Sequence, residues 1–199
     1  MRLLAYALAN PVGGFICSGA AGRLKTPFIY ILLTGIVLQT GGIFLISETP
    51  TTPTELELGQ FGYAVVAGLG VGMAVAAVYM MVPLVVEERD QSIALGMSLQ
   101  LRMLGGALGI AIATTILNSH LKSQLPSVLQ PEQVSAVLDS VQMVATFPPD
   151  VQIQVLEFYA EGYNRQMKAA GAFSVAQLLS AGLLWKKDQV RFLRDAQDK

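Results

Sequence analysis

The chain has 199 residues, of which 53% are hydrophobic and only 14% are charged, and its formal net charge is −1. Soluble domains carry about 25% charged residues, so this shortage of charge indicates a membrane protein. The near-neutral balance excludes a basic nucleic-acid surface, and one cysteine and one histidine exclude a disulfide scaffold and a cysteine- or histidine-rich metal site. We therefore predict no cofactor, no metal ion and no nucleic-acid partner.

Five apolar stretches contain no Asp or Glu, and they lie at about 3–21, 28–47, 61–86, 96–118 and 169–185. A carboxylate at the centre of a bilayer costs about 2.5–3.5 kcal/mol on insertion scales, so this separation is typical of segments that cross lipid. Each stretch is close to the roughly 20 residues that a spanning helix needs. The predicted fold class is all-α, an integral membrane bundle of five transmembrane helices in a lipid bilayer.

The segment 119–168 is amphipathic, interrupted by prolines and too polar to span a membrane. Pro131 and Pro149 mark expected helix starts, because proline fits the first position of a helix. The sequence thus predicts a transmembrane region over 1–185 that includes this amphipathic segment, followed by a charged tail over 186–199.

Lys and Arg are distributed unequally between the two predicted sides of the membrane. With five spans, one side holds eight of them and the other holds four, spread over longer polar segments. The positive-inside rule therefore predicts a cytoplasmic C-terminus, an N-terminus outside the cell and an extracellular location for 119–168.

The order of several short motifs resembles the major facilitator superfamily. The runs 10–14 and 19–25, with sequences NPVGG and GAAGRLK, resemble a span and cytoplasmic loop of that family, and 67–72 (AGLGVG) looks like its glycine-rich span. The runs 87–90 (EERD), 100–109 (QLRMLGGALG) and 161–167 (EGYNRQM) are similar to the fungal-type 14-span drug:proton antiporters. The order and spacing of these runs carry the resemblance, which covers the last five of fourteen spans.

The resemblance implies the C-terminal part of a major facilitator fold in the plasma membrane. Its function would be efflux of small amphiphilic compounds, by proton antiport in a full-length protein, with the missing N-terminal half as partner. The spans contain no acid, so we expect a proton-carrying carboxylate to lie in that missing half. The alternative is a truncated or small membrane protein without transport activity that associates with a larger transporter. No nucleophile constellation or phosphate-binding loop indicates an enzyme.

Polar residues in or beside the spans are candidates for a substrate path, namely Asn10, Gln39, Tyr79, Arg102 and Gln177. The uncharged ones could instead form hydrogen bonds between helices. Arg102 could pair with an acid or a substrate, or its guanidinium could reach the membrane interface and contact lipid phosphate. His120, at the end of a span, is expected to be solvated.

Two further sets complete the candidates. Gly22, Arg23, Lys25, Glu87 and Arg89 lie in loops where charged residues could form gating ion pairs or simply set the topology. A second set of small residues is predicted to allow close packing of helices, and it comprises Gly68, Gly72, Gly105, Gly106 and Gly109.

Overall fold

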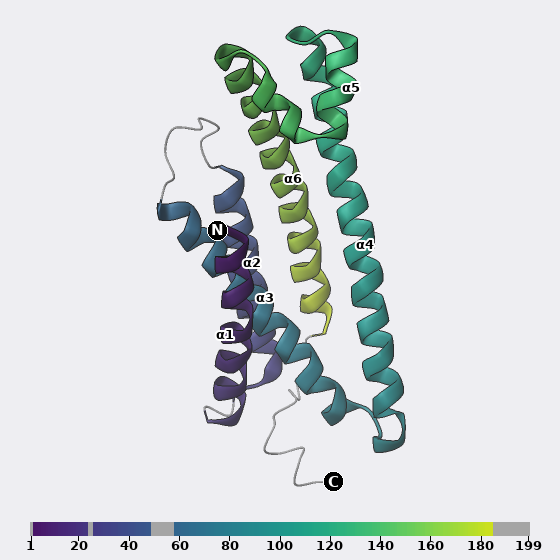
Figure 1. Cartoon of the computed structure of the whole chain (residues 1–199). Helices are drawn as coiled ribbons and strands as arrows, with labels where there is room; N and C mark the ends of the chain where they lie inside the picture. Colours follow the sequence, from purple (N-terminus) through teal and green to yellow (C-terminus); the bar gives the residue numbers. More distant parts are fainter. Residues whose placement is uncertain (1, 24–25, 49–57, 185–199) are drawn as a thin grey trace.

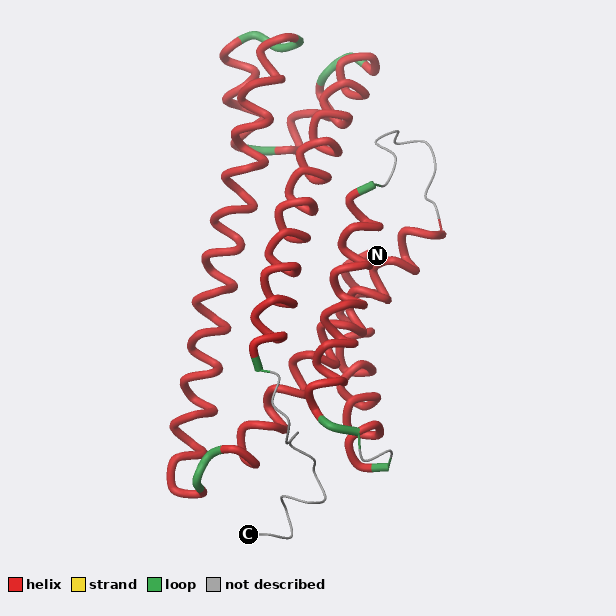
Figure 2. Tube along the Cα trace, turned by 180° about the vertical axis from the view of Figure 1, so that it is seen from behind, coloured by secondary structure: helices red, strands yellow, loops and turns green. Residues whose placement is uncertain are grey.

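The computed structural model describes residues 2–23, 26–48 and 58–184, and these residues form helices with no strand among them (Figure 2). Six α-helices follow in order: α1 Arg2–Gly22, α2 Phe28–Ser47, α3 Leu58–Val85, α4 Gln91–Gln124, α5 Pro131–Asp139 and α6 Pro149–Leu183. Three short 3-10 helices connect them: η1 Glu88–Asp90, η2 Leu125–Ser127 and η3 Val141–Thr146. Helices suit this apolar sequence because lipid offers backbone groups no hydrogen-bond partner, so each segment must satisfy its own.

The predicted all-α membrane bundle is confirmed. Three segments are long and apolar enough to cross a membrane, at Phe28–Ser47, Phe61–Val85 and Glu88–Ser127, and they match the second, third and fourth predicted spans. Helices α1 and α6 complete five long helices that run alternately up and down (Figure 1). It stays a prediction that all five long helices cross the membrane. The inside–outside orientation and the domain limits also stay predictions.

Helix α3 forms the centre of one half of the bundle. It packs against both α1 and α2, while α6 packs against α2 and α4, so α6 joins α4 to the rest (Figure 1). The core between these helices includes Cys17, Phe28, Ile36 and Met73, each less than a tenth exposed. Helix α4 touches α3 only lightly, and none of its residues before His120 is buried.

A second apolar core lies at the far end of α4 and α6, where α5, η2 and η3 fold between them (Figure 1). We call this region, residues 117–159, the cap. Its fully buried side chains include Leu125, Val137 and Val155. The predicted helix starts at Pro131 and Pro149 are confirmed, and the Gln130 backbone N–H donates to Gln133 Oε1 at 3.1 Å ahead of α5.

Helix α6 continues through residue 169, where the fifth span is predicted to begin, and no proline interrupts its 35 residues after its start. The limits of that span stay a prediction. The expectation that His120 is solvated is wrong. Its side chain lies within the cap and is 1% exposed, with Nε2 3.3 Å from Glu161 Oε2. The charged tail 186–199 lies outside the described residues.

Candidate functional site

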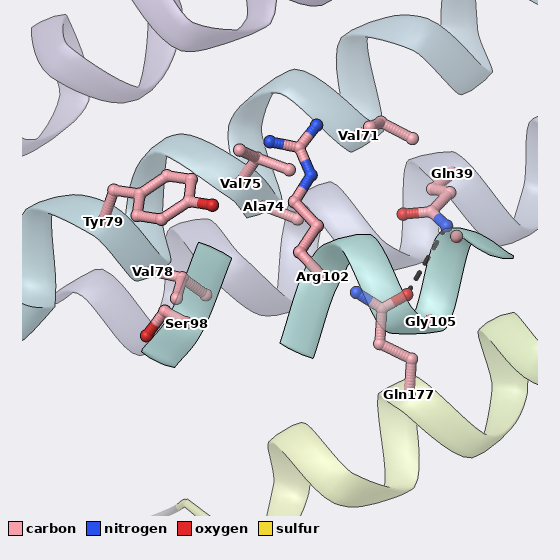
Figure 3. Close-up of a pocket in the computed structure, with 11 residues that line it drawn as sticks. Gln39, Val71, Ala74, Val75, Val78, Tyr79, Ser98, Arg102, Gly105 and Gln177 are labelled. Carbon is pink, nitrogen blue, oxygen red and sulfur yellow. Dashed lines mark hydrogen bonds between the residues drawn. The ribbon is translucent and has the colours of Figure 1, made fainter. Parts of the chain in front are cut away.

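Two adjoining cavities lie between α4 and the rest of the bundle. The first, which we call the polar cavity, has a volume of about 510 Å³ and is lined by Gln39, Val71, Ala74, Val75, Val78, Tyr79, Ser98, Arg102, Gly105, Gly106 and Gln177 (Figure 3). The second, the apolar cavity, has a volume of about 550 Å³, and its walls include Ile43, Leu108, Ile112, Ile116 and Phe173. Gln39, Gly105 and Gln177 line both, so the cavities meet at these three residues. Volumes of this size suit small organic molecules.

One face of α4 supplies much of both cavities. Ser98, Arg102 and Gly105 follow one another at intervals of four and three residues, and Gly109, Ile112 and Ile116 continue the same spacing. Residues at these intervals share one side of a helix. The face is polar near Arg102 and becomes aliphatic toward the cap.

Two amides mark the junction of the cavities. Gln39 Nε2 on α2 donates to Ser174 Oγ and to Gln177 Oε1 on α6, each at 3.4 Å (Figure 3). Ser174, which is 3% exposed, donates in turn to the Ala170 carbonyl at 3.1 Å. These bonds hold α2 to α6 at Gln39, the twelfth residue of twenty in α2, so the junction lies near the middle of the helix.

Arg102 is the one Asp, Glu, Lys or Arg among the described residues that line either cavity. Figure 3 shows its guanidinium beside Val75 of α3, with Tyr79 on one side and the amide pair on the other. The ion pairs in the described chain lie elsewhere and join Arg89 to Asp90, His120 to Glu161 and Lys168 to Glu48. The side chain therefore faces a cavity and has no counter-charge in the part of the chain that the structure describes.

The structure brings four of the five path candidates together in the polar cavity: Gln39, Tyr79, Arg102 and Gln177. Asn10 lies apart, on α1, where its backbone carbonyl faces Gly72 of α3. This placement suits helix packing, so Asn10 lines neither cavity.

The glycine candidates divide into two groups. Gly68 and Gly72 lie where α3 meets α1, and a Cβ on Gly68 would come within 2.6 Å of the Tyr6 carbonyl oxygen. A Cβ on Gly105, Gly106 or Gly109 would meet no other atom within 4 Å. The last three glycines therefore pack against no helix of the described chain.

The loop candidates lie at helix ends, away from both cavities. Arg89 pairs with the adjacent Asp90 at 3.5 Å, and both side chains are largely exposed, so the pair adds little stability. Arg23 and Glu87 are exposed near the ends of α1 and η1, and Gly22 ends α1. Lys25 lies outside the described residues.

Sequence reasoning did not single out several contacts that build the site. Gly35 and Gly42 bring α2 against α3, where Gly35 meets the Gly70 backbone and Gly42 meets Ala67. Their seven-residue spacing on α2 is a signal that could have identified the contact. Gln166, whose Nε2 donates to the Ala113 carbonyl at 2.7 Å, ties α6 to α4 and was also missed.

The two cavities leave room for a small molecule between α4 and the rest of the bundle. Among the described residues, no group of three or more His, Cys, Asp or Glu is placed to hold a metal ion. The fold and the cavities thus define a helical membrane protein with two adjoining cavities between its helices.

Curated proteins that are similar to this chain include a transporter, a multidrug resistance protein and an efflux pump. The chain is 35% identical to the MFS-type transporter FPY5 of Fusarium mangiferae over 92% of its own length and 31% of the relative. It is 24% identical to the multidrug resistance protein fnx1 of Schizosaccharomyces pombe, over 82% of this chain and 32% of the relative. It is 26% identical to the rubrofusarin-specific efflux pump aurT of Gibberella zeae, over 76% of this chain and 28% of the relative.

These matches confirm the predicted relationship to efflux transporters of the major facilitator superfamily. The chain spans about a third of the length of the curated relatives that it matches. No protein-family model matches the chain, and no solved structure matches it.

Proposed function

We propose that the chain forms one part of a membrane transporter that exports small amphiphilic compounds, and that a longer polypeptide completes the path. The observation that supports this most strongly is the similarity to transporters over three quarters or more of the chain. The paired cavities add a place for the solute, because they combine a polar part around Arg102 with an aliphatic part around Phe173.

The open side of α4 supports a missing partner. Its long apolar side chains are exposed in the described chain, including Leu101, Met103, Leu104 and Ile110. In the proposed whole transporter, helices of the N-terminal half cover part of this surface and lipid covers the rest. Transport then follows from rocking of one helix bundle against another around the cavity.

Proton antiport is part of the proposal and requires an acid that the described spans do not supply. Among the described residues no Asp or Glu lines either cavity. We assign the proton-carrying carboxylate to the completing half, the N-terminus of this chain to the outside and the C-terminus to the cytoplasm of the plasma membrane.

The direct test is to read the DNA upstream of the Met1 codon for further spans in frame and to reconstitute the encoded protein in liposomes. An inward-directed pH gradient should drive movement of an amphiphilic dye, and a protonophore should abolish it. Proton-driven movement by the isolated 199 residues would contradict the proposal that the completing half carries the proton. Absence of movement by the complete protein would contradict the transport function for the dye class tested.

A second function is favoured by the exposed glycines of α4. Because Gly105 and Gly106 contact no described helix, a full-length transporter could pack against them while this chain itself transports nothing. Co-purification with a larger transporter that is lost in Gly106→Leu but kept in Gly19→Leu, at another open glycine, would favour this alternative. Retention of the partner in both variants would exclude it.

A further inference from the structure

Among the described residues, those that line the paired cavities carry positive charge and no negative charge. Arg102 is their sole Asp, Glu, Lys or Arg among described residues, and its guanidinium is turned toward α3 within the polar cavity (Figure 3). The other polar groups that surround this cavity are neutral: two amides, a hydroxyl and a phenol, from Gln39, Gln177, Ser98 and Tyr79. A cation in a site without an acid favours a ligand that brings the negative charge itself.

Arg102 lies away from both ends of α4 and shares its cavity with Gln39, near the middle of α2. Arg102 itself is exposed in the described chain. Charged side chains at membrane depth are costly and pair with an opposite charge when they face a cavity. None of the ion pairs in the described chain involves Arg102, so the described residues supply no such partner there.

The neighbouring amides leave hydrogen-bonding atoms for the same ligand. Because Gln39 Nε2 already donates to Gln177 Oε1, the Gln39 carbonyl oxygen and the Gln177 NH₂ group remain for other partners. Figure 3 shows both atoms turned to the side of the pair on which Arg102 lies. A planar guanidinium binds a carboxylate through two parallel hydrogen bonds, and the Gln177 amide can donate a third.

The adjoining apolar cavity provides room for the rest of the ligand. Leu108, Ile112 and Phe173 line it, and it meets the polar cavity at Gly105, where the missing side chain keeps the passage open. A molecule with an acidic group at Arg102 can therefore extend its hydrocarbon part along α4 toward the cap.

We propose that the compounds handled by this chain are amphiphilic organic anions, with a carboxylate or similarly acidic group held by Arg102 and an apolar body in the cavity lined by Phe173. This inference rests on the proposed function, because it names the substrate class of the same cavity. It makes Arg102 a specificity-determining residue, which touches the ligand through its charge.

The test compares two probes of nearly equal size, 2-naphthoate and its neutral amide, 2-naphthamide. Binding is measured by equilibrium dialysis against the complete 199-residue chain in nanodiscs of zwitterionic lipid, with empty nanodiscs as the blank. The wild-type chain should bind 2-naphthoate at least about tenfold more tightly than 2-naphthamide, since a hydrogen bond to a charged group contributes more than a neutral one. A matching cation, 2-naphthylmethylammonium, should bind more weakly than either.

Three variants locate the effect. Arg102→Gln should abolish the preference for the anion and leave binding of the amide within about twofold, because the exposed side chain supports no core packing. Arg102→Lys should keep part of the preference, since an ammonium retains the charge but loses the two-pronged geometry. Arg89→Gln, an exposed loop position outside both cavities, is the matched control and should behave as wild type.

The outcomes separate this inference from the proposed function. If wild type binds the amide and the anion equally, or if Arg102→Gln keeps the anion preference, the anion assignment is wrong while the amphiphile-binding cavity stands. If no probe shows saturable binding above empty nanodiscs, both the anion assignment and the cavity as a binding site are contradicted. Preference for the cationic probe would overturn the assignment in the opposite sense.

Discussion

The sharpest structural prediction concerns two adjacent glycines of α2. A Cβ on Gly42 would lie 2.7–2.9 Å from backbone and side-chain atoms of Ala67 on α3, whereas a Cβ on Gly41 would meet nothing within 4 Å. Ordinary contact begins near 3.4 Å, so at a typical 2.8 Å the approach is about 0.6 Å too close (3.4 less 2.8). Two of the three close atoms are backbone, so the helices themselves must move apart.

The magnitude follows from two opposing terms. Replacing glycine by alanine within a helix gains about 1 kcal/mol from reduced backbone entropy, and this gain applies equally to Gly41 and Gly42. Forcing an extra methyl group into a packed contact costs about 1–3 kcal/mol. The difference between the two variants therefore isolates the packing term, and Gly42→Ala should be less stable than Gly41→Ala by about 1–3 kcal/mol.

Steric trapping in bicelles measures the free energy of unfolding of a membrane protein and suits this comparison. Adding Ala67→Gly to Gly42→Ala should recover only part of the loss, because it removes one close atom and leaves the Ala67 backbone nitrogen and Cα. Equal stability of Gly41→Ala and Gly42→Ala would refute the close approach of α2 and α3 on which the position of Gln39 depends.

Three further predictions concern the cap. Leu125→Ala should lower the stability of the cap by about 2–5 kcal/mol, as for other fully buried leucines. Leu156→Ala, at a position 43% exposed, should lower it far less. Hydrogen exchange of the α5 amides measures the stability of both variants. The Tyr159 hydroxyl donates a hydrogen bond to the Val137 carbonyl at 3.2 Å, so Tyr159→Phe should lower the stability of the cap by about 1 kcal/mol. Tyr163→Phe should change it little. Equal losses in the same exchange measurement would contradict the role of this hydrogen bond. Burial raises the pKa of Tyr159 above its usual value of 10, so the phenol ionises at a lower pH in the unfolded chain than in the folded one. The stability of the wild-type cap should therefore fall as the pH rises above about 10. This fall should be absent in Tyr159→Phe.

Much of the fold could be predicted from the sequence because its signals are strong and local. Long runs without acids define α2 and α3, and Pro131 and Pro149 define where α5 and α6 begin. The polarity of the sequence changes near residue 169, where the fifth span is predicted to begin, while helix α6 continues through that point. Polarity and helix continuity are separate properties, and only the first is visible as a change in hydropathy.

The cavity could be predicted only in part. Polarity within apolar runs indicated Gln39, Arg102 and Gln177, which the structure brings to one place. Asn10 shows the same signal but lies in the α1–α3 contact, because side-chain polarity does not report which helix lies opposite. The prediction for His120 was wrong for a related reason: the residue follows a predicted span, but α6 packs over it at Glu161 and Gly162.

The central claim is that the face of α4 carrying Arg102 lines a solvated chamber while its other side faces lipid or a partner. Thiol labelling by a membrane-impermeant methanethiosulfonate tests it directly in nanodiscs, at Gly106→Cys in the polar cavity and at Leu104→Cys, an exposed position that lines neither cavity. The native Cys17 is fully buried, so the unmodified chain gives the background rate. We predict rapid labelling at position 106 that 2-naphthoate slows, and little labelling at position 104. Faster reaction at 104 than at 106 would contradict the chamber.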